Sequence, residues 1–558
     1  MASDSTKAPA PMGVAPMPHE DKLVAQAQQV EHQATHHAQV EHTLTIRAAI
    51  KHYRWAIIWC IAVSMTVVMD GYDTILMGNF YAFPTFQKKY GRFVGVSEKS
   101  TSGYQLEAAW QAAVGNGSGI GGFFANKGLA GALINGYLVT KFGHRRVIVY
   151  SLMILSCFIF VIFFAPNIQV LFVGQILCGM PWGIFATSAP AYASEMLPMV
   201  LRVYFTSWTN MCFIIGQLIA AGVLRGCLSR DDEWGYKIPF AIQWLWPAML
   251  IPLLWFAPES PWHLVRHGRF EEAEASLRRL QDDDCPTSPQ ETVAAIHHTD
   301  TLERELSVGT SYKDCFKGFE RRRTEIACLC FAGQIMSGTP IAYNATYFYS
   351  QVGLHPKTIY NLNLGGTGLA LVGAICSWVF LMPRLGRRTI YVSGTFTMGT
   401  MLYVIGILNV WAKKDHHIGM GQAVIAVMWK FVFQLSVGQL GWAIPAEIGS
   451  TRLRQKTIVL ARNAYYIVLV IANVLQPYMM NPTAWGLSGY TGFVWGTTAF
   501  IVCTWAFFRL PETKDRTFEE IDILFARKVS ARKFANTTVN NLESEQEKYE
   551  FVNTYKRV

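Results

Sequence analysis

Long apolar runs, separated by short charged or turn-rich breaks, fill most of this 558-residue sequence. A helix needs about 20 mainly apolar residues to cross a bilayer. Hydrophobic residues make up 51% of the chain and charged residues only 15%, whereas soluble domains are about 25% charged. The sequence therefore predicts an all-α membrane protein with twelve transmembrane helices. The expected spans are 55–78, 119–140, 147–165, 168–190, 204–224, 239–257, 325–349, 361–382, 390–412, 421–446, 458–480 and 490–509.

The segment between the sixth and seventh spans is soluble in character. Apolar and charged residues alternate with helical spacing over 270–280, and 282–289 is rich in turn-forming residues. We expect a cytoplasmic helical linker that joins two bundles of six helices. The predicted organisation is a disordered cytoplasmic tail (1–50), an N-terminal bundle (51–257), the linker (258–324), a C-terminal bundle (325–509) and a second cytoplasmic tail (510–558).

Basic residues indicate the orientation in the membrane. The net charge is +10, and Lys and Arg cluster beside alternate ends of the spans, before the first and after the second, eighth and tenth. Cytoplasmic loops carry such an excess of Lys and Arg. The loop at 79–110 also contains basic residues, but the other clusters outweigh it. We expect both termini in the cytoplasm and no role in nucleic-acid binding.

Metal and disulfide sites find little support. His32 and His36 are one helical turn apart in the N-terminal tail, which has no signal peptide, and we interpret that tail as solvated rather than as a zinc site. Cys328 and Cys330 form a C-x-C pair without a second ligand pair. The other cysteines fall mostly inside apolar spans, where free thiols are expected.

Several short motifs occur twice in the same order, with the second copy about 250 residues after the first. A Gly-x-Arg or Gly-Arg-Arg phrase, a Glu followed seven residues later by Arg, and Pro-Glu-Ser or Pro-Glu-Thr each appear in both halves. The pairs are Gly143-His144-Arg145-Arg146 with Gly386-Arg387-Arg388, Glu195 and Arg202 with Glu447 and Arg454, and 258–260 with 511–513. Duplicated halves place a substrate site between them at mid-membrane, reached alternately from each side.

Together these phrases resemble the sugar porter family of the major facilitator superfamily, over residues 55 to 525. Gly71-Tyr72-Asp73-Thr74 in the first span and Pro258-Glu259-Ser260-Pro261-Trp262 after the sixth complete the pattern. Three longer stretches, 70–91, 174–183 and 445–462, are similar to the fungal α-glucoside (maltose-type) permeases, which are proton symporters. The resemblance implies the major facilitator fold and transport of a maltose-like sugar.

Asp70 and Asp73 share one face of the first span because they are three residues apart. A carboxylate inside a bilayer is costly and can be neutralised by taking up a proton, so we expect these acids to couple proton movement to transport. In many sugar porters the matching aspartate faces an arginine in the fourth span. Here that place is Gln175, so Asp73 lacks this counter-charge.

A second departure concerns Lys127. The resemblance places a glutamate eight residues before the Asn-Gly at 135–136, and this sequence has Lys127 there. Two interpretations are open. Lys127 pairs with Asp70 or Asp73 and favours the ionised carboxylate, or it extends to the outer surface and contacts neither.

Sugar recognition needs planar hydrogen-bonding groups and an aromatic face. The resemblance implies that four residues in spans five, seven and ten, together with Gln175, contact the sugar: Gln334, Trp442, Asn210 and Gln217. The alternative is that an amide inside a span only forms hydrogen bonds between helices and does not contact the sugar.

The resemblance and the repeat also imply a cytoplasmic gate. Ion pairs between the halves would hold the inner face shut. The alternative is that these charges are solvated and only fix the orientation in the membrane. The candidates are Arg145, Arg146, Glu195, Arg202, Arg387, Arg388, Glu447 and Arg454.

No catalytic constellation and no phosphate-binding loop are found, and the Gly-rich run 115–122 follows no strand. The sequence thus predicts no enzyme and no cofactor. It predicts a plasma-membrane carrier whose partners are a sugar, protons and the lipid bilayer, with no obligate protein partner. The alternatives are a sugar sensor that does not transport and a passive hexose facilitator.

Overall fold

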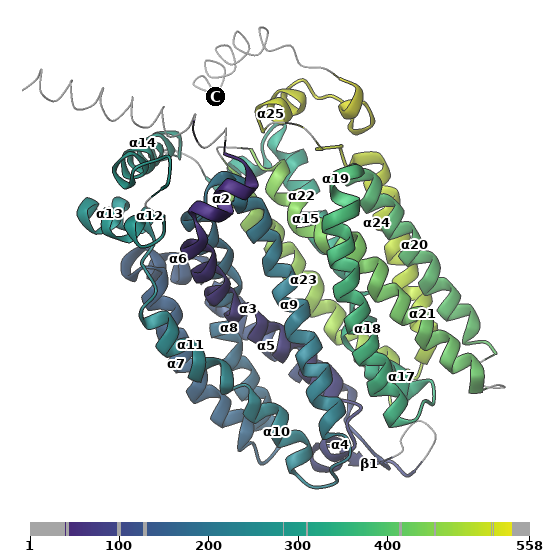
Figure 1. Ribbon diagram of the computed structural model, residues 1–558. Coiled ribbons are helices and arrows are strands. Elements are labelled where there is room, and N and C mark those ends of the chain that lie inside the picture. The colour runs from purple at the N-terminus through teal and green to yellow at the C-terminus, as the bar shows by residue number, and fades with distance from the viewer. Residues whose placement is uncertain are drawn as a thin grey trace, which may run out of the picture.

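The computed structural model describes Val40 and residues 44–96, 102–126, 131–282, 284–307, 311–411, 416–450, 453–514, 516 and 518–537. Within these residues the chain is almost entirely helical, and one two-stranded antiparallel hairpin joins β1 (Arg92–Phe93) to β2 (Tyr104–Gln105). Long helices run side by side along one axis (Figure 1). The first six spans lie together on one side of the molecule and the last six on the other.

The N-terminal half contains six spans. They are α3 (Arg54–Phe80), α5 with α6 (Ala108–Asn126, Gly131–Phe142), α7 (His144–Phe163), α8 (Ile168–Met196), α9 (Met199–Cys227) and α10 with α11 (Trp234–Ile242, Leu245–Trp255). The short helix α4 (Pro84–Tyr90) follows the first span.

The C-terminal half repeats this arrangement. Its spans are α15 with α16 and α17 (Glu320–Met336, Thr339–Tyr343, Ala345–Gln351), α18 with η2 and α19 (Pro356–Cys376, Ser377–Leu381, Met382–Arg384), α20 (Arg387–Leu408), α21 with α22 (His416–Leu435, Val437–Ile448), α23 (Arg454–Met480) and, after η3 (Ser488–Tyr490), α24 (Thr491–Arg509).

Ten of these spans are long and apolar enough to cross a membrane, among the residues that the structure describes. The other two are α5 with α6, where 127–130 are not described, and the broken span α15–α17. The second span differs from our expectation, because its helix begins at Ala108 rather than near 119. Its first turns contain polar residues such as Gln111 and Asn116, which lower the local hydropathy but are buried inside the bundle.

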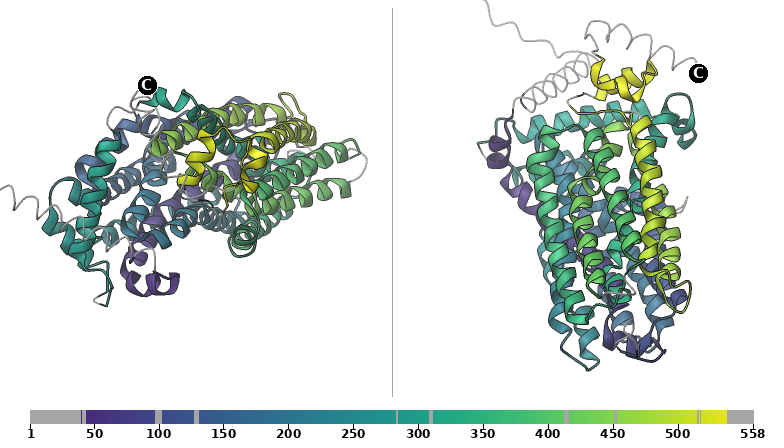
Figure 2. Two further views of the ribbon diagram at one scale, coloured as in Figure 1. Left: turned by 90° about the horizontal axis from the view of Figure 1, so that it is seen from above. Right: turned by 90° about the vertical axis from the view of Figure 1, so that its right-hand side faces the viewer.

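Short helices cap one end of the bundle, which we call the basic end (top of Figure 1). They are α2 (Ile46–His52), the linker helices α12 (Pro261–Arg266), α13 (Phe270–Arg278) and α14 (Pro289–Ser307), η1 (Tyr312–Phe316), and the C-terminal α25 (Phe518–Ala526) and η4 (Ala531–Asn536). Views from above and from the side show them lying across the helix ends (Figure 2).

Ion pairs attach these caps to the bundle. Arg54, in the first turn of α3, donates to Asp282 at 2.8 Å. The fully buried Arg323, in the first turn of α15, pairs with Asp522 of α25 at 2.5 Å. The caps are therefore held to the ends of spans one and seven, the equivalent spans of the two halves.

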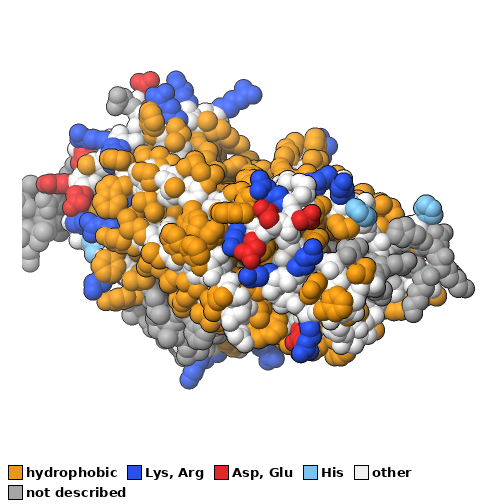
Figure 3. Space-filling model, turned by 90° about the horizontal axis from the view of Figure 1, so that it is seen from below, with side chains coloured by type: hydrophobic (Ala, Val, Ile, Leu, Met, Phe, Trp, Pro, Cys, Tyr) orange, Lys and Arg blue, Asp and Glu red, His pale blue; other side chains and the backbone are white. Residues whose placement is uncertain are grey.

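The opposite end, which we call the far end, is covered mainly by hydrophobic and uncharged side chains, with a group of charged ones near the middle of the view (Figure 3). The ion pairs at this end include Lys89 with Glu233 at 3.2 Å and Arg92 with Glu107 at 3.0 Å. Two basic residues of the 79–110 loop, Lys89 and Arg92, thus have acidic partners.

Hydrogen bonds join the two halves near the far end. The Thr346 hydroxyl donates to Asn79 Oδ1 at 2.9 Å, and Tyr360 donates to the Asn79 carbonyl at 2.8 Å. Asn481 Nδ2 donates to the Leu106 carbonyl at 2.9 Å. Because these groups are buried, each bond would leave unpaired polar atoms if it were broken. The structure is therefore closed between the halves at this end.

Candidate functional site

A cavity of about 190 Å³ lies between the two halves, in the middle of the bundle. Spans one, two, four and five line it from the N-terminal half, and spans seven, ten and eleven line it from the C-terminal half. Several of its polar residues lie at or beside helix breaks. Gly338, with φ of +106°, separates α15 from α16, and Ser436 separates α21 from α22. Irregular backbone at membrane depth is tolerated where it lines such a cavity.

Asp73 lies in the wall of this cavity and is 2% exposed. Gln243, at the break between α10 and α11, donates to its Oδ1 at 2.7 Å. The fully buried Gln175 of α8 lies beside the same carboxyl group. Among the side chains that the structure describes, no Lys or Arg forms an ion pair with Asp73. Its neighbours are neutral amides, which suits a carboxyl group that gains and loses a proton.

Asp70 lines the cavity one turn away and has a different setting. It interacts electrostatically with Arg462 of α23, which lines the cavity from the other half. The Arg462 guanidinium lies 4.0 Å from the ring centroid of Trp442, within the range of a cation–π interaction. Asp70 therefore has a charged neighbour, whereas the neighbours of Asp73 are uncharged.

The structure brings together the four residues that the resemblance assigned to the sugar. Gln334, Trp442, Asn210 and Gln217 all line the cavity. Asn210 Nδ2 donates to Gln434 Oε1 at 3.3 Å, which links the halves. Gln334 is 6% exposed, and its Nε2 has no hydrogen-bond partner in the structure, so it is available to a ligand.

Gln175, which the resemblance also assigned to the sugar, is not among the residues that line the cavity. Gln175 is buried behind it, beside Asp73. Lys127 lies outside the described residues, so both interpretations of it stay predictions.

The charged residues proposed for a gate lie at the basic end, where each duplicated acid bonds within its own half. Glu195 contacts His144, and Glu447 contacts Arg387 at 3.4 Å. Arg145 donates to the Ala257 carbonyl at 3.2 Å, and Arg388 donates to the Phe507 carbonyl at 2.8 Å. Arg146 is exposed. The side chains of Arg202 and Arg454 lie outside the described part of the structure. Ion pairs between the halves stay a prediction.

Sequence reasoning missed three polar residues inside the spans. Arg462 and Lys430 are cations inside apolar spans, and the argument that selected Asp70 applies equally to them. Arg462 lines the cavity, whereas Lys430 donates to Asn363 Oδ1 at 3.1 Å within the C-terminal half. Gln243 is an amide inside span six, and only the packing of span six against span one reveals its contact with Asp73.

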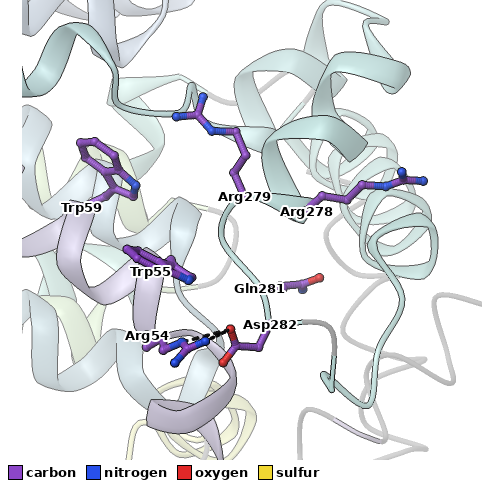
Figure 4. A pocket seen from close by; sticks show the side chains of 7 residues that line it. All are labelled: Arg54, Trp55, Trp59, Arg278, Arg279, Gln281 and Asp282. Carbon is purple, nitrogen blue, oxygen red and sulfur yellow. Dashed lines mark hydrogen bonds and ion pairs between the residues drawn. The ribbon is translucent and has the colours of Figure 1, made fainter.

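A second hollow, of about 430 Å³, lies at the basic end between the first turns of α3 and the segment after α13 (Figure 4). Arg54, Trp55, Trp59, Arg279 and Asp282 are among the residues around it. Its charged groups are already bonded, Arg54 to Asp282 and Arg279 to the Phe256 carbonyl. It is also more exposed than the central cavity, because the Arg54 side chain is 62% exposed. The central cavity is therefore the better candidate for the substrate site.

Comparison with known proteins agrees with this architecture. The family model described as "Sugar (and other) transporter" matches residues 59–525. A solved structure of the Escherichia coli xylose transporter XylE, in a partially occluded inward-open conformation, superposes with a TM-score of 0.65, covering 83% of this chain and 100% of that one. At 17% sequence identity this likeness establishes the fold, which is that of the twelve-helix major facilitator transporters.

Among curated proteins, the maltose permease MAL31 of Saccharomyces cerevisiae is 36% identical over 506 residues, which is 90% of this chain and 80% of the relative. The general alpha-glucoside permease of the same species is 37% identical with the same coverage. These relatives are permeases, and the match extends over both six-helix halves. The chain therefore belongs to the sugar transporter family, in the subgroup of the fungal α-glucoside permeases.

Proposed function

We propose that this protein is a proton-coupled symporter of an α-linked disaccharide, which it carries across the plasma membrane by alternating access. The observation that carries the proposal is the position of Asp73. Its carboxyl group lies in the wall of a cavity between the halves and is bonded by an amide rather than by a cation. Such a group can hold a proton in one conformation and release it in another.

The cavity lining supports a sugar as the cargo. Amides from both halves, Gln217, Gln334 and Gln434 among them, surround a space that Trp442 borders on one side. Small-molecule sites of this kind combine aromatic walls with a few polar groups that fix orientation. The names of the relatives, maltose and alpha-glucoside permeases, support an α-linked glucoside as the specific cargo.

The closed far end agrees with alternating access, in which one end of the carrier is shut at a time. We propose that the far end faces outward and the basic end faces the cytoplasm, with both termini and the linker helices α12–α14 inside. The basic clusters at that end agree with the excess of Lys and Arg in cytoplasmic loops. A glycosylation tag inserted at Gln290 should stay unglycosylated, and glycosylation there would contradict this orientation.

The coupling experiment replaces the carboxyl group that is proposed to carry the proton. Adding maltose to weakly buffered cells that express the wild type, but lack carriers of their own, should make the medium more alkaline. Asp73→Asn should abolish both this alkalinisation and the accumulation of labelled maltose above its external concentration. Asp232→Asn, an exposed acid at the far end, is the matched control and should behave like the wild type.

Two other results would replace the proposal. Uptake that only equilibrates, with no change of external pH in the wild type, would make the protein a passive facilitator. Sugar binding without uptake would favour a sensor. Full accumulation by Asp73→Asn would remove Asp73 from the coupling mechanism.

A further inference from the structure

The glycines of α5 differ in their surroundings. Gly117 and Gly121 face α8, where an added Cβ would collide with Gln175 and with the Ile176 carbonyl. Close packing of the two helices therefore requires these glycines. Gly119 points elsewhere, and a Cβ built there would have no atom within 4 Å. Helix packing does not explain why position 119 has no side chain.

The open space beside Gly119 belongs to the central cavity. Gly119 and Gly122 line that cavity from α5, and Gly179 and Gly183 line it from the adjoining α8. This wall of four glycines lies in the half opposite Gln334 and Trp442. The open space at position 119 therefore lies on the α5–α8 side of the cavity, in the half opposite Gln334 and Trp442.

Trp182 gives this wall a second feature, which points to a ligand. Its side chain lines the cavity between Gly179 and Gly183, is only 4% exposed, and its indole N–H has no hydrogen-bond partner. The ring is fixed by an edge-to-face contact with Phe185, with centroids 6.0 Å apart. Buried tryptophans usually find an acceptor for this N–H, so an unpaired one in a cavity wall needs an acceptor from elsewhere.

We propose that Gly119, Gly122 and Trp182 form the subsite for the second glycosyl ring of the disaccharide. The glycines leave room for the ring, Trp182 provides an apolar surface, and its N–H donates to a hydroxyl of that ring. The first ring binds near Gln334 and Trp442. This inference rests on the proposed function, and it makes position 119 the residue that discriminates between disaccharides and monosaccharides.

Two ligands test the subsite on the purified full-length carrier. Maltose has both rings, and methyl α-glucoside has one ring with the same α-linkage. The wild type should bind maltose at least about tenfold more tightly than methyl α-glucoside. Gly119→Leu should weaken maltose binding by at least about tenfold and leave methyl α-glucoside within about twofold, because the added side chain fills only the second subsite.

Trp182→Phe keeps an aromatic ring and removes only the N–H. It should weaken maltose binding by roughly 3- to 10-fold, the effect of one lost hydrogen bond, without changing the binding of methyl α-glucoside. Trp182→Phe also tests the subsite independently if Gly119→Leu fails to fold. The matched control is Gly365→Leu, which makes the same change at an exposed position of α18 with equally open space. Leucine is a better helix former than glycine, so neither change should weaken its helix, and the control should bind both sugars normally.

The outcomes separate the subsite from the function. Equal weakening of both sugars by Gly119→Leu and Trp182→Phe, no effect of either variant, or a wild type without preference for maltose would overturn the subsite while leaving sugar transport intact. A wild type that takes up no α-glucoside would overturn the proposed function, and the subsite with it.

Discussion

At the basic end, each half contains an equivalent cluster of a glutamate, a hydroxyl donor and a nitrogen-bearing side chain. The nitrogen-bearing side chain is the one that differs most between the halves. In the C-terminal half, Glu447 contacts Arg387 at 3.4 Å and accepts from Thr513 at 2.5 Å. In the N-terminal half, Glu195 contacts His144 at 3.3 Å and accepts a hydrogen bond from the Ser260 hydroxyl. His144 and Arg387 each follow the glycine of the duplicated motif, so an imidazole stands in one half where a guanidinium stands in the other.

The two clusters also differ in their contacts with the linker helices. Arg266 of the linker helix α12 lies 3.8 Å from Glu195 and 3.1 Å from Asp300 of α14. The N-terminal cluster therefore takes an arginine from the linker. In the C-terminal cluster, the Arg387 guanidinium also donates to the Met382 carbonyl in its own half. Duplicated motifs thus preserve the acid and its hydroxyl donor, while the source of positive charge differs between halves.

The largest expected effect comes from the motif glycines, each of which packs against a carboxylate in its own half. A Cβ on Gly386 would collide with the Glu512 carboxylate, which accepts from the backbone N–H groups of Arg387 and Arg388 at 2.6 and 3.2 Å. Gly386→Ala should displace that carboxylate at a cost of about 1–3 kcal/mol for each N–H left without an acceptor. Thermal unfolding of the detergent-purified protein measures the loss.

Gly143→Ala, the equivalent change, should cost more. Its Cβ would collide with Glu259, and Gly143 also has φ of +85°, which strains any other residue. Gly365→Ala, in open space on α18, is the control. If Gly386→Ala proves the more harmful of the two, positive φ is not the deciding factor.

The acids give the second effect. Glu195→Gln should destabilise more than Glu447→Gln, because Glu195 is the less exposed side chain, at 18% against 26%, and contacts three groups rather than two. We expect about 1–3 kcal/mol for Glu195→Gln and about 1 kcal/mol or less for Glu447→Gln. Unfolding temperatures of the two variants, side by side with the wild type, would settle the order. Equal losses would show that the linker arginine contributes nothing.

The smallest effect tests the exchanged position itself. His144 is 4% exposed, whereas the Arg387 side chain is 23% exposed. His144→Arg should therefore cost about 1–3 kcal/mol through overpacking, while Arg387→His should cost about 1 kcal/mol or less through the loss of a partly exposed ion pair. A stabilising His144→Arg would mean that the available space does not decide which side chain stands at this position in each half.

Much of the architecture follows from the sequence alone, for a local physical reason. The length and hydropathy of the apolar runs predict twelve spans, and the structure confirms their order. The duplicated motifs predict two similar halves, because a motif copied with its spans brings the same contacts. The cost of a charge in lipid singles out Asp70 and Asp73, and both line the cavity. Gln334, Trp442, Asn210 and Gln217 required the family resemblance, since an amide in a span has several possible roles.

Only the tertiary structure decided which of these side chains meet. Spacing along a helix identifies a face but not the helix that covers it. Gln243 therefore emerged as the partner of Asp73, and Arg462 as the neighbour of Trp442, once spans six and eleven were in place. The start of the second span at Ala108 escaped a hydropathy argument because its first turns contain polar residues that are buried inside the bundle. The open space at Gly119 depends on the separation of the two halves, which no local pattern in the sequence encodes.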